Sequence, residues 1–118
     1  MTRAVFYRRN GRLAGFDIKG HSGYAESGSD IVCAAVSTLT EIVECTVNDQ
    51  AKAGADVNVD AKKAEITLRL PETLCEEKQK ICQSVLEAAL MVLSEYARQY
   101  KGYLETAEKI IDGGRNNA

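Results

Sequence analysis

The chain has 118 residues, the size of one domain. Apolar residues make up 45% and charged residues 27%, close to globular averages, which excludes a wholly disordered chain and a two-domain enzyme. The formal net charge of −2 gives no bulk electrostatic support for a nucleic-acid binder. Basic residues gather in residues 1–20, where a solvated face of a hairpin explains them as well as a binding patch does.

The chain shows no apolar stretch typical of a signal peptide near its start. Its longest continuous apolar run, residues 88–93, is far below the roughly 20 residues that a membrane span needs. We therefore expect a cytoplasmic protein without membrane contact and with reduced cysteines. With one histidine and no Cys-x-x-Cys pair, the sequence predicts no metal site and no cofactor. The cysteines are Cys33, Cys45, Cys75 and Cys82.

The first elements are predicted to form a β-hairpin. Residues 5–7 and 13–19 read as strands, and Asn10-Gly11 between them is the residue pair preferred in a type I′ turn. Ala14, Phe16 and Ile18 are expected to face the core. Three glycines and three serines then mark residues 20–29 as an irregular loop.

Apolar residues recur at helical spacing from Asp30 to Lys52, and Gly54 is the expected stop. Residues 57–60 and 64–70 alternate as a second hairpin with one buried face, which Pro71 ends. A capping box, Thr73 with Glu76, predicts the start of a long helix that ends near Gly102. Its expected inner stripe is Ile81, Val85, Leu86, Ala89, Val92, Leu93, Tyr96 and Tyr100.

The sequence of residues 103–111 fits either a short edge strand or a further helical turn. The order ββαββα predicts an α+β two-layer sandwich, with a mostly antiparallel sheet packed on two helices. We expect one domain over residues 1–112 and a flexible tail over residues 113–118.

His21 and Cys33 are the residues that point to chemistry. His21 follows a strand, Cys33 lies in the first turn of the next helix, and the glycine-rich loop between them can fold back. The unpaired N–H groups and the dipole of a helix start favour a thiolate. A thiolate beside an imidazolium is the activated nucleophile of cysteine hydrolases, although spacing alone makes this a weak signal.

Two further polar residues share the helix face of Cys33. Asp30 lies three residues before it and either orients His21 or caps the helix. Ser37 lies four residues after it and either donates to the substrate or thiolate or is a solvated serine. Cys45 is interpreted as a small packing residue, and Tyr96 and Tyr100 as helix packing or a dimer edge.

Residues 20–25 read Gly-His-Ser-Gly-Tyr-Ala, and residues 28–37 read Gly-Ser-Asp-Ile-Val-Cys-Ala-Ala-Val-Ser. This combination closely resembles the signature of the bacterial ribosomal-processing cysteine protease family, called Prp. The resemblance extends through Asn48, the following ββα elements and the overall length, up to about Lys101.

The resemblance implies a protease that removes the N-terminal extension of a large-subunit ribosomal protein, cutting after a hydrophobic-aromatic motif. It places the catalytic pair on His21 and Cys33. It also implies a homodimer that meets nucleic acid only indirectly. The implied supporting residues are Gly20, Asp30 and Ser37, and the implied substrate loop over the site includes Ser22, Gly23, Tyr24, Gly28 and Ser29.

Two other functions are weighed against the protease. A non-catalytic ribosome-assembly or rRNA-binding module would use the basic first hairpin, and salt-dependent RNA binding without cleavage would favour it. A thiol redox sensor built on Cys33 would need a second cysteine close to it in space.

Overall fold

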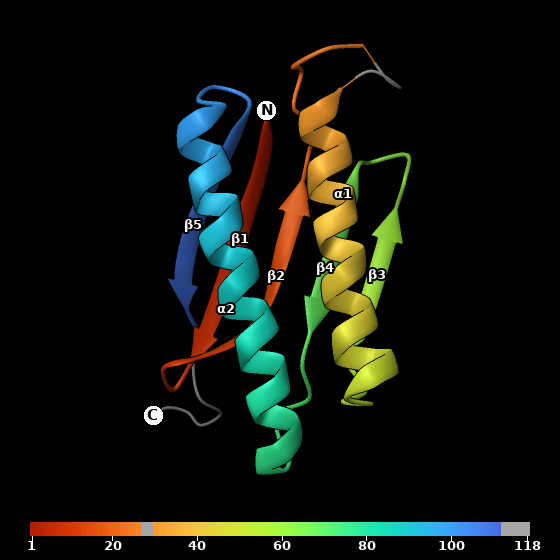
Figure 1. The fold of residues 1–118 in the computed structure, drawn as a ribbon, viewed down its shortest axis with the longest axis vertical. Coiled ribbons are helices and arrows are strands. Elements are labelled where there is room, and N and C mark those ends of the chain that lie inside the picture. The colour runs from red at the N-terminus through yellow and green to blue at the C-terminus, as the bar shows by residue number, and fades with distance from the viewer. Residues whose placement is uncertain (27–29, 112–118) are drawn as a thin grey trace.

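The computed structural model describes residues 1–26 and 30–111, within which five strands form one sheet in the order β3-β4-β2-β1-β5. Both helices cover the same face of that sheet, so the predicted α+β two-layer sandwich is confirmed (Figure 1). The predicted tail, residues 113–118, lies outside the described residues. The elements are β1 (Thr2–Arg9), β2 (Arg12–Lys19), α1 (Ile31–Glu44), the π-helix η1 (Cys45–Gln50), β3 (Asp56–Asp60), β4 (Glu65–Arg69), α2 (Glu76–Gln99) and β5 (Leu104–Ile110).

The hairpin of β1 and β2 turns at Asn10 and Gly11, whose φ angles of 54° and 81° confirm the predicted turn. Close to this turn the pairing shifts by one residue, so that Ala14 is a bulge and both it and Leu13 are buried. Farther along β2, a Cβ on Gly15 would lie 1.9 Å from the carbonyl oxygen of Leu68. Strands β2 and β4 can pair this closely only because that residue is glycine.

Residues 103–111, for which the sequence fitted either a strand or a helical turn, contain strand β5, which pairs in parallel with β1. Arg8 fixes this edge, because its guanidinium bonds Glu108 of β5 at 2.7 Å and Glu87 of α2 at 2.8 Å. The hydrogen bond from Arg8 lowers the pKa of Glu87, against the opposing effect of burial. One arginine on β1 thus ties the last strand and the second helix to the sheet.

The predicted helix over residues 30–52 changes form part-way along. Asp30 is its N-cap, as one of its two interpretations had it, and the regular α-helix ends at Glu44 before six π-helical residues. The hydroxyl of Thr46 bonds to the carbonyl of Ile42 at 2.8 Å and so competes with the regular ladder. The N–H of Ala51 then bonds to the carbonyl of Thr46, five residues earlier.

Helices α1 and η1 together are long and apolar enough to cross a membrane by length and composition, with a mean hydropathy of 1.4 over an 18-residue window within Ile31–Gln50. The core helix of a globular domain can have the same composition, and Val32, Val36, Val43 and Val47 are buried. Only 28% of that 18-residue window is buried, however. Part of the apolar character of α1 therefore lies on its outer side, where Ile31 and Ile42 are exposed.

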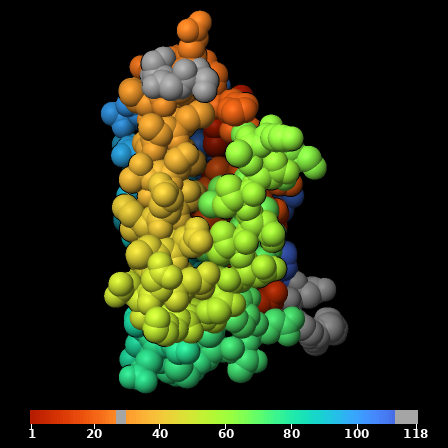
Figure 2. Space-filling view, turned by 90° about the vertical axis from the view of Figure 1, so that its right-hand side faces the viewer, coloured from red at the N-terminus to blue at the C-terminus, as the bar shows by residue number. Residues whose placement is uncertain are grey.

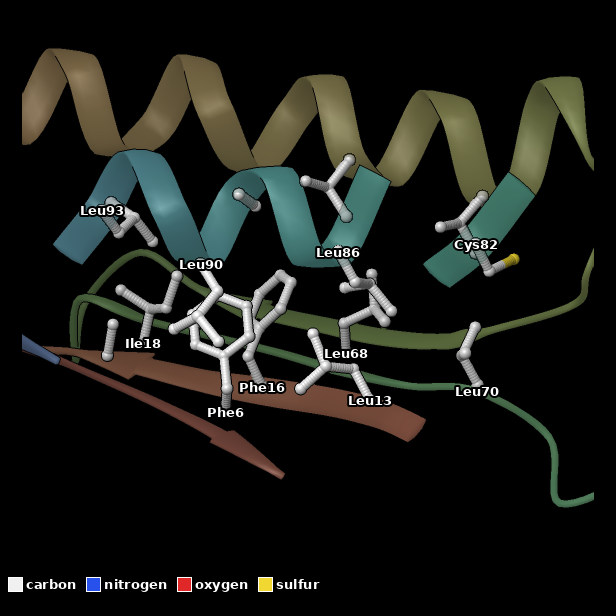
Figure 3. Packing of buried hydrophobic residues seen from close by; sticks show 14 of the residues in the cluster. Phe6, Leu13, Phe16, Ile18, Leu68, Leu70, Cys82, Leu86, Leu90 and Leu93 are labelled. Atoms are coloured by element: carbon white, nitrogen blue, oxygen red, sulfur yellow. The ribbon is translucent and has the colours of Figure 1, made fainter. Parts of the chain in front are cut away.

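One expectation for α2 is wrong, and another holds only in part. The helix begins at Glu76 behind Cys75, without a side-chain cap, so the capping box at Thr73 does not form. The expected inner stripe holds in part. It is buried or packed against the core at Val85, Leu86, Ala89, Leu93, Tyr96 and Tyr100, whereas Ile81 and Val92 are exposed and Cys82 and Leu90 are buried in addition. Figure 3 shows Leu86 and Leu90 packed toward Phe6 and Phe16, whose ring centroids are 5.4 Å apart.

The second hairpin, β3 with β4, confirms the predicted strands but only part of the buried face. Leu68 on β4 is buried, and Ile66 packs against the core. Val59 is 66% exposed although the alternation predicts it to be buried. It lies on the edge strand of the sheet, close to the turn, so it lacks a strand on its outer side.

Candidate active site

The predicted site lies at the end of the molecule where β2 stops and α1 begins, and where α2 also ends (Figure 1). Gly20 leaves β2 with φ of +95°, a conformation that favours glycine. Its N–H bonds the carbonyl of Ala64 at 2.8 Å, and its carbonyl accepts the hydroxyl of Thr2 at 2.9 Å. A Cβ there would lie 2.6 Å from the carbonyl oxygen of Met1. Gly20 thus fixes the direction in which the chain reaches His21.

The carboxylate of Asp30 joins the loop to the helix start. Its Oδ1 accepts the N–H of Cys33 at 2.9 Å. Its Oδ2 accepts the hydroxyl of Ser22 and the N–H groups of Tyr24 at 3.2 Å and Ala25 at 3.4 Å. Of the two sequence-based interpretations, the structure supports capping, since none of these bonds involves His21.

Asp30 is ionised over most of the pH range. Burial raises its pKa, but hydrogen bonds from Ser22, Cys33 and Ala25 outweigh that effect and hold the pKa at about 2. The carboxylate therefore remains a hydrogen-bond acceptor under all ordinary conditions.

Cys33 is half-buried, and its Sγ accepts the main-chain N–H of Ser22 at 3.4 Å. This nitrogen belongs to the peptide group that joins Ser22 to His21, so the loop brings the main chain of His21 close to the sulfur. The imidazole is exposed, and within residues 1–26 and 30–111 it makes no hydrogen bond. The folding back of the loop is thus observed, while direct contact between the two side chains is not.

The remaining residues predicted for the site differ in where the structure places them. Ser37 is exposed on α1, and its carbonyl accepts the hydroxyl of Thr40 at 2.8 Å, but its own hydroxyl makes no bond to Cys33. Gly23 has φ of +74° in open space. Gly28 and Ser29 lie outside the described residues. In the part of the chain that the structure describes, no group of three or more His, Cys, Asp or Glu could hold a metal ion.

A tyrosine cluster beside the loop was not predicted from the sequence. The ring of Tyr24 lies 5.5 Å from that of Tyr100 and 5.2 Å from that of Tyr103, both edge to face. Tyr96 extends the cluster at 6.2 Å from Tyr100. The spacing of Tyr96 and Tyr100 signals that they share a helix face. Nothing local in the sequence signals the contact with Tyr24.

The remaining cysteines lack such surroundings. Cys45 and Cys75 are exposed, so the interpretation of Cys45 as a packing residue is wrong. Cys82 is fully buried, and burial raises the pKa of its thiol. Cys33 alone combines partial exposure, a helix start and a main-chain donor on its sulfur.

A half-buried cysteine in the first turn of a helix, with the loop that follows a histidine folded back onto its sulfur, is compatible with a thiol-dependent hydrolase. The family model described as "Cysteine protease Prp" matches residues 1–105, so this chain belongs to the Prp family and is a cysteine protease. It is 30% identical over 115 residues to the ribosomal processing cysteine protease Prp of Bacillus subtilis, an alignment covering 94% of this chain and 100% of that one.

Solved structures agree with this fold. The essential ribosomal processing protease Prp of S. aureus, bound to a covalently linked product peptide, matches with a TM-score of 0.82 and 22% identity, covering 92% of this chain and all of that one. SMU.848 of Streptococcus mutans matches with a TM-score of 0.80 and 26% identity, covering 94% and 96%. A substrate-peptide complex of the S. aureus protein matches with a TM-score of 0.77 and 19% identity, covering 92% and 100%.

Proposed function

We propose that this protease uses Cys33 and His21 to remove the N-terminal extension of a bacterial large-subunit ribosomal protein. The observation that carries the proposal is the loop N–H on Sγ of Cys33, which places the chain at His21 beside the helix start. The name of the Bacillus subtilis relative, a ribosomal processing protease, supports the substrate class.

The chemistry needs only these two side chains and water. The Cys33 thiolate attacks the scissile carbonyl carbon, and the resulting oxyanion collapses as the C–N bond breaks. The His21 imidazolium gives its proton to the leaving amine, which leaves a thioester on Sγ. Neutral His21 then takes a proton from water, whose oxygen attacks the thioester. The acid product leaves, and the thiolate and imidazolium are restored.

Cleavage after a hydrophobic-aromatic motif is part of the proposal. The ring cluster of Tyr24, Tyr100 and Tyr103 supports it, because Tyr24 and Tyr103 stay partly exposed beside the loop and offer ring edges and faces to an aromatic side chain. Figure 2 shows the surface hollowed between α1 and the β3–β4 hairpin, with residues of the first two strands at its base.

The test is mass spectrometry of a ribosomal-protein precursor incubated with the enzyme. We expect the wild type to remove the extension, and Cys33→Ser and His21→Ala to lose at least 100-fold in rate, in line with general acid–base contributions of about 10²–10⁴. Cys45→Ser, which changes an exposed cysteine on the same helical stretch, is the matched control. Comparable cleavage by Cys33→Ser would rule out this nucleophile.

The rRNA-binding alternative loses its main support in the structure. Three of the basic residues behind it pair with carboxylates: Arg3 with Glu105, Arg8 with Glu87 and Glu108, and Arg12 with Glu76. The first hairpin therefore presents a largely neutralised surface instead of a basic patch.

We also propose that two copies form a homodimer in the cytoplasm, where a ribosomal-protein substrate is synthesised. The apolar outer face of the helices supports this, since Ile42, Met91 and Val92 are 58%, 73% and 40% exposed. Sedimentation equilibrium is expected to give a dimer mass for the wild type and a monomer mass for Met91→Glu. A monomeric wild type at micromolar concentration would contradict the dimer.

A further inference from the structure

We infer that Ser22 is a positioning residue: its hydroxyl, held by Asp30, fixes its own main-chain N–H on Sγ of Cys33, and that N–H stabilises the thiolate. The inference rests on the proposed function for its use in catalysis. Ionisation of Cys33 can nevertheless be measured without any substrate, so the two can fail separately.

Ser22 is buried at the centre of a small hydrogen-bond network. Ser22 is 2% exposed although it lies in an otherwise exposed loop, and a buried hydroxyl requires partners. It has both kinds: the hydroxyl donates to Oδ2 of Asp30 and accepts the N–H of Tyr24 at 3.1 Å. Because both bonds are local, they fix the main chain at Ser22 relative to the start of α1.

The other main-chain N–H groups near the sulfur already have acceptors. The N–H of Cys33 is taken by Oδ1 of Asp30, and that of Ala34 by the carbonyl of Asp30 at 3.1 Å. The helix start therefore does not turn these two donors toward Sγ. Among residues 1–26 and 30–111, the N–H of Ser22 is the main-chain donor that bonds the sulfur.

The charge of Asp30 also acts on Cys33. The ionised carboxylate of Asp30 lies on the residue that caps Cys33, and a negative charge this close opposes a thiolate. An N–H aimed at the sulfur counters that effect, because hydrogen bonds to charged groups are stronger than neutral ones. The role of Asp30 is then to hold Ser22 in place, at some electrostatic cost to the nucleophile.

The experiment measures the alkylation rate of each cysteine by iodoacetamide as a function of pH, with peptide mapping on the full chain. In Ser22→Ala we expect the pH midpoint for Cys33 to rise by about half a unit to one unit, so that labelling near pH 7 slows roughly 3- to 10-fold. Thr38→Ala, which removes an exposed hydroxyl from α1, is the matched control and should behave as wild type.

Asp30→Asn separates positioning from charge. Asparagine keeps an oxygen that caps the helix, but its amide nitrogen cannot accept the bonds that Oδ2 accepts. Removing a negative charge alone would lower the midpoint for Cys33 and speed labelling. We expect the opposite, slower labelling, because Ser22 is released. The double variant with Ser22→Ala and Asp30→Asn should label Cys33 no more slowly than the slower of the two single variants. Both substitutions disrupt the same set of hydrogen bonds, so their effects should not add.

The other cysteines report on folding. Exposed Cys45 and Cys75 should keep their rates, and buried Cys82 should stay protected. An unchanged midpoint in Ser22→Ala, or faster labelling in Asp30→Asn, overturns the inference. So does exposure of Cys82 in both variants, which would make Ser22 a structural residue. If precursor cleavage is absent in wild type while the midpoint shifts as expected, the proposed function fails and this inference stands.

Discussion

At the scale of residues, Asp30 shows how much of the geometry of the site can be predicted from the sequence. Its place before an apolar helical pattern predicted an N-cap, and the bond to Cys33 N–H confirms one. The bonds from Ser22, Tyr24 and Ala25 to the second oxygen could not be predicted. They depend on the path of a loop whose glycines permit many conformations.

The low pKa of Asp30 predicts a dependence of stability on pH. Its pKa is lowered from 3.8 to about 2 on folding, so the ionised carboxylate stabilises the native state above about pH 4. This contribution declines as the pH falls through the window toward 2. Urea unfolding of wild type and Asp30→Asn should therefore differ more at pH 5 than at pH 2. A difference that stays constant with pH would contradict the assigned bonds.

Gly20 gives a second prediction at this scale. Alanine at Gly20 or Gly54 has to adopt a positive φ, which costs about 1 kcal/mol. Only at Gly20 does the added Cβ also meet a carbonyl, that of Met1, whereas Gly54 faces open space. We expect Gly20→Ala to lower the free energy of unfolding by about 1–3 kcal/mol more than Gly54→Ala, measured by urea titration. Equal losses of unfolding free energy in the two variants would mean that the chain around Gly20 can shift to accommodate the added Cβ.

At the scale of elements, α2 shows where periodicity misleads. Apolar residues occupy more than one face of this helix, so more than one stripe fits the spacing. The sheet selects the stripe that contains Cys82, Leu86, Leu90 and Leu93, because Phe6 and Phe16 lie opposite it (Figure 3). Long-range packing of this kind is absent from a local pattern.

The departure of Ile81 from the predicted stripe can be tested with two residues that the sequence places on one face. Leu86 is fully buried and Ile81 is 43% exposed. We expect Leu86→Ala to lower the free energy of unfolding by about 2–5 kcal/mol and Ile81→Ala by less than about 1 kcal/mol. Thermal and urea unfolding would measure both. Similar losses for the two would support the stripe predicted from sequence.

At the scale of the whole molecule, the class and the two hairpin pairs followed from the sequence, because each hairpin is local, but the antiparallel pair of β2 and β4 that joins the hairpins did not. The parallel pair of β1 and β5 did not, since it joins strands about a hundred residues apart and no turn residue marks it. The family match ends at residue 105, yet β5 continues to Ile110, whose neighbour Ile111 bonds the carbonyl of Arg8 at 2.8 Å.

A pair of truncations tests this boundary. A chain ending at residue 112 keeps β5 and should unfold at the same urea concentration as the full chain. A chain ending at residue 103 loses Leu104, which is 2% exposed, and leaves β1 at an open edge. We expect it to be largely unfolded or aggregated by circular dichroism and gel filtration. A stable fold from the shorter chain would contradict the structural role of β5.

The connection from Tyr103 to the site bears on how the enzyme is made. The carbonyl of Tyr103 holds the N–H of Thr2 at 2.9 Å, and the hydroxyl of Thr2 holds Gly20, the residue before His21. During translation, residues 1–33 leave the ribosome long before this segment exists. The nascent chain thus carries Cys33 and His21, the proposed catalytic pair, before the segment that holds Thr2 and Gly20 in place has been made. We expect activity only once Tyr103 has left the ribosome and its carbonyl has bonded the N–H of Thr2.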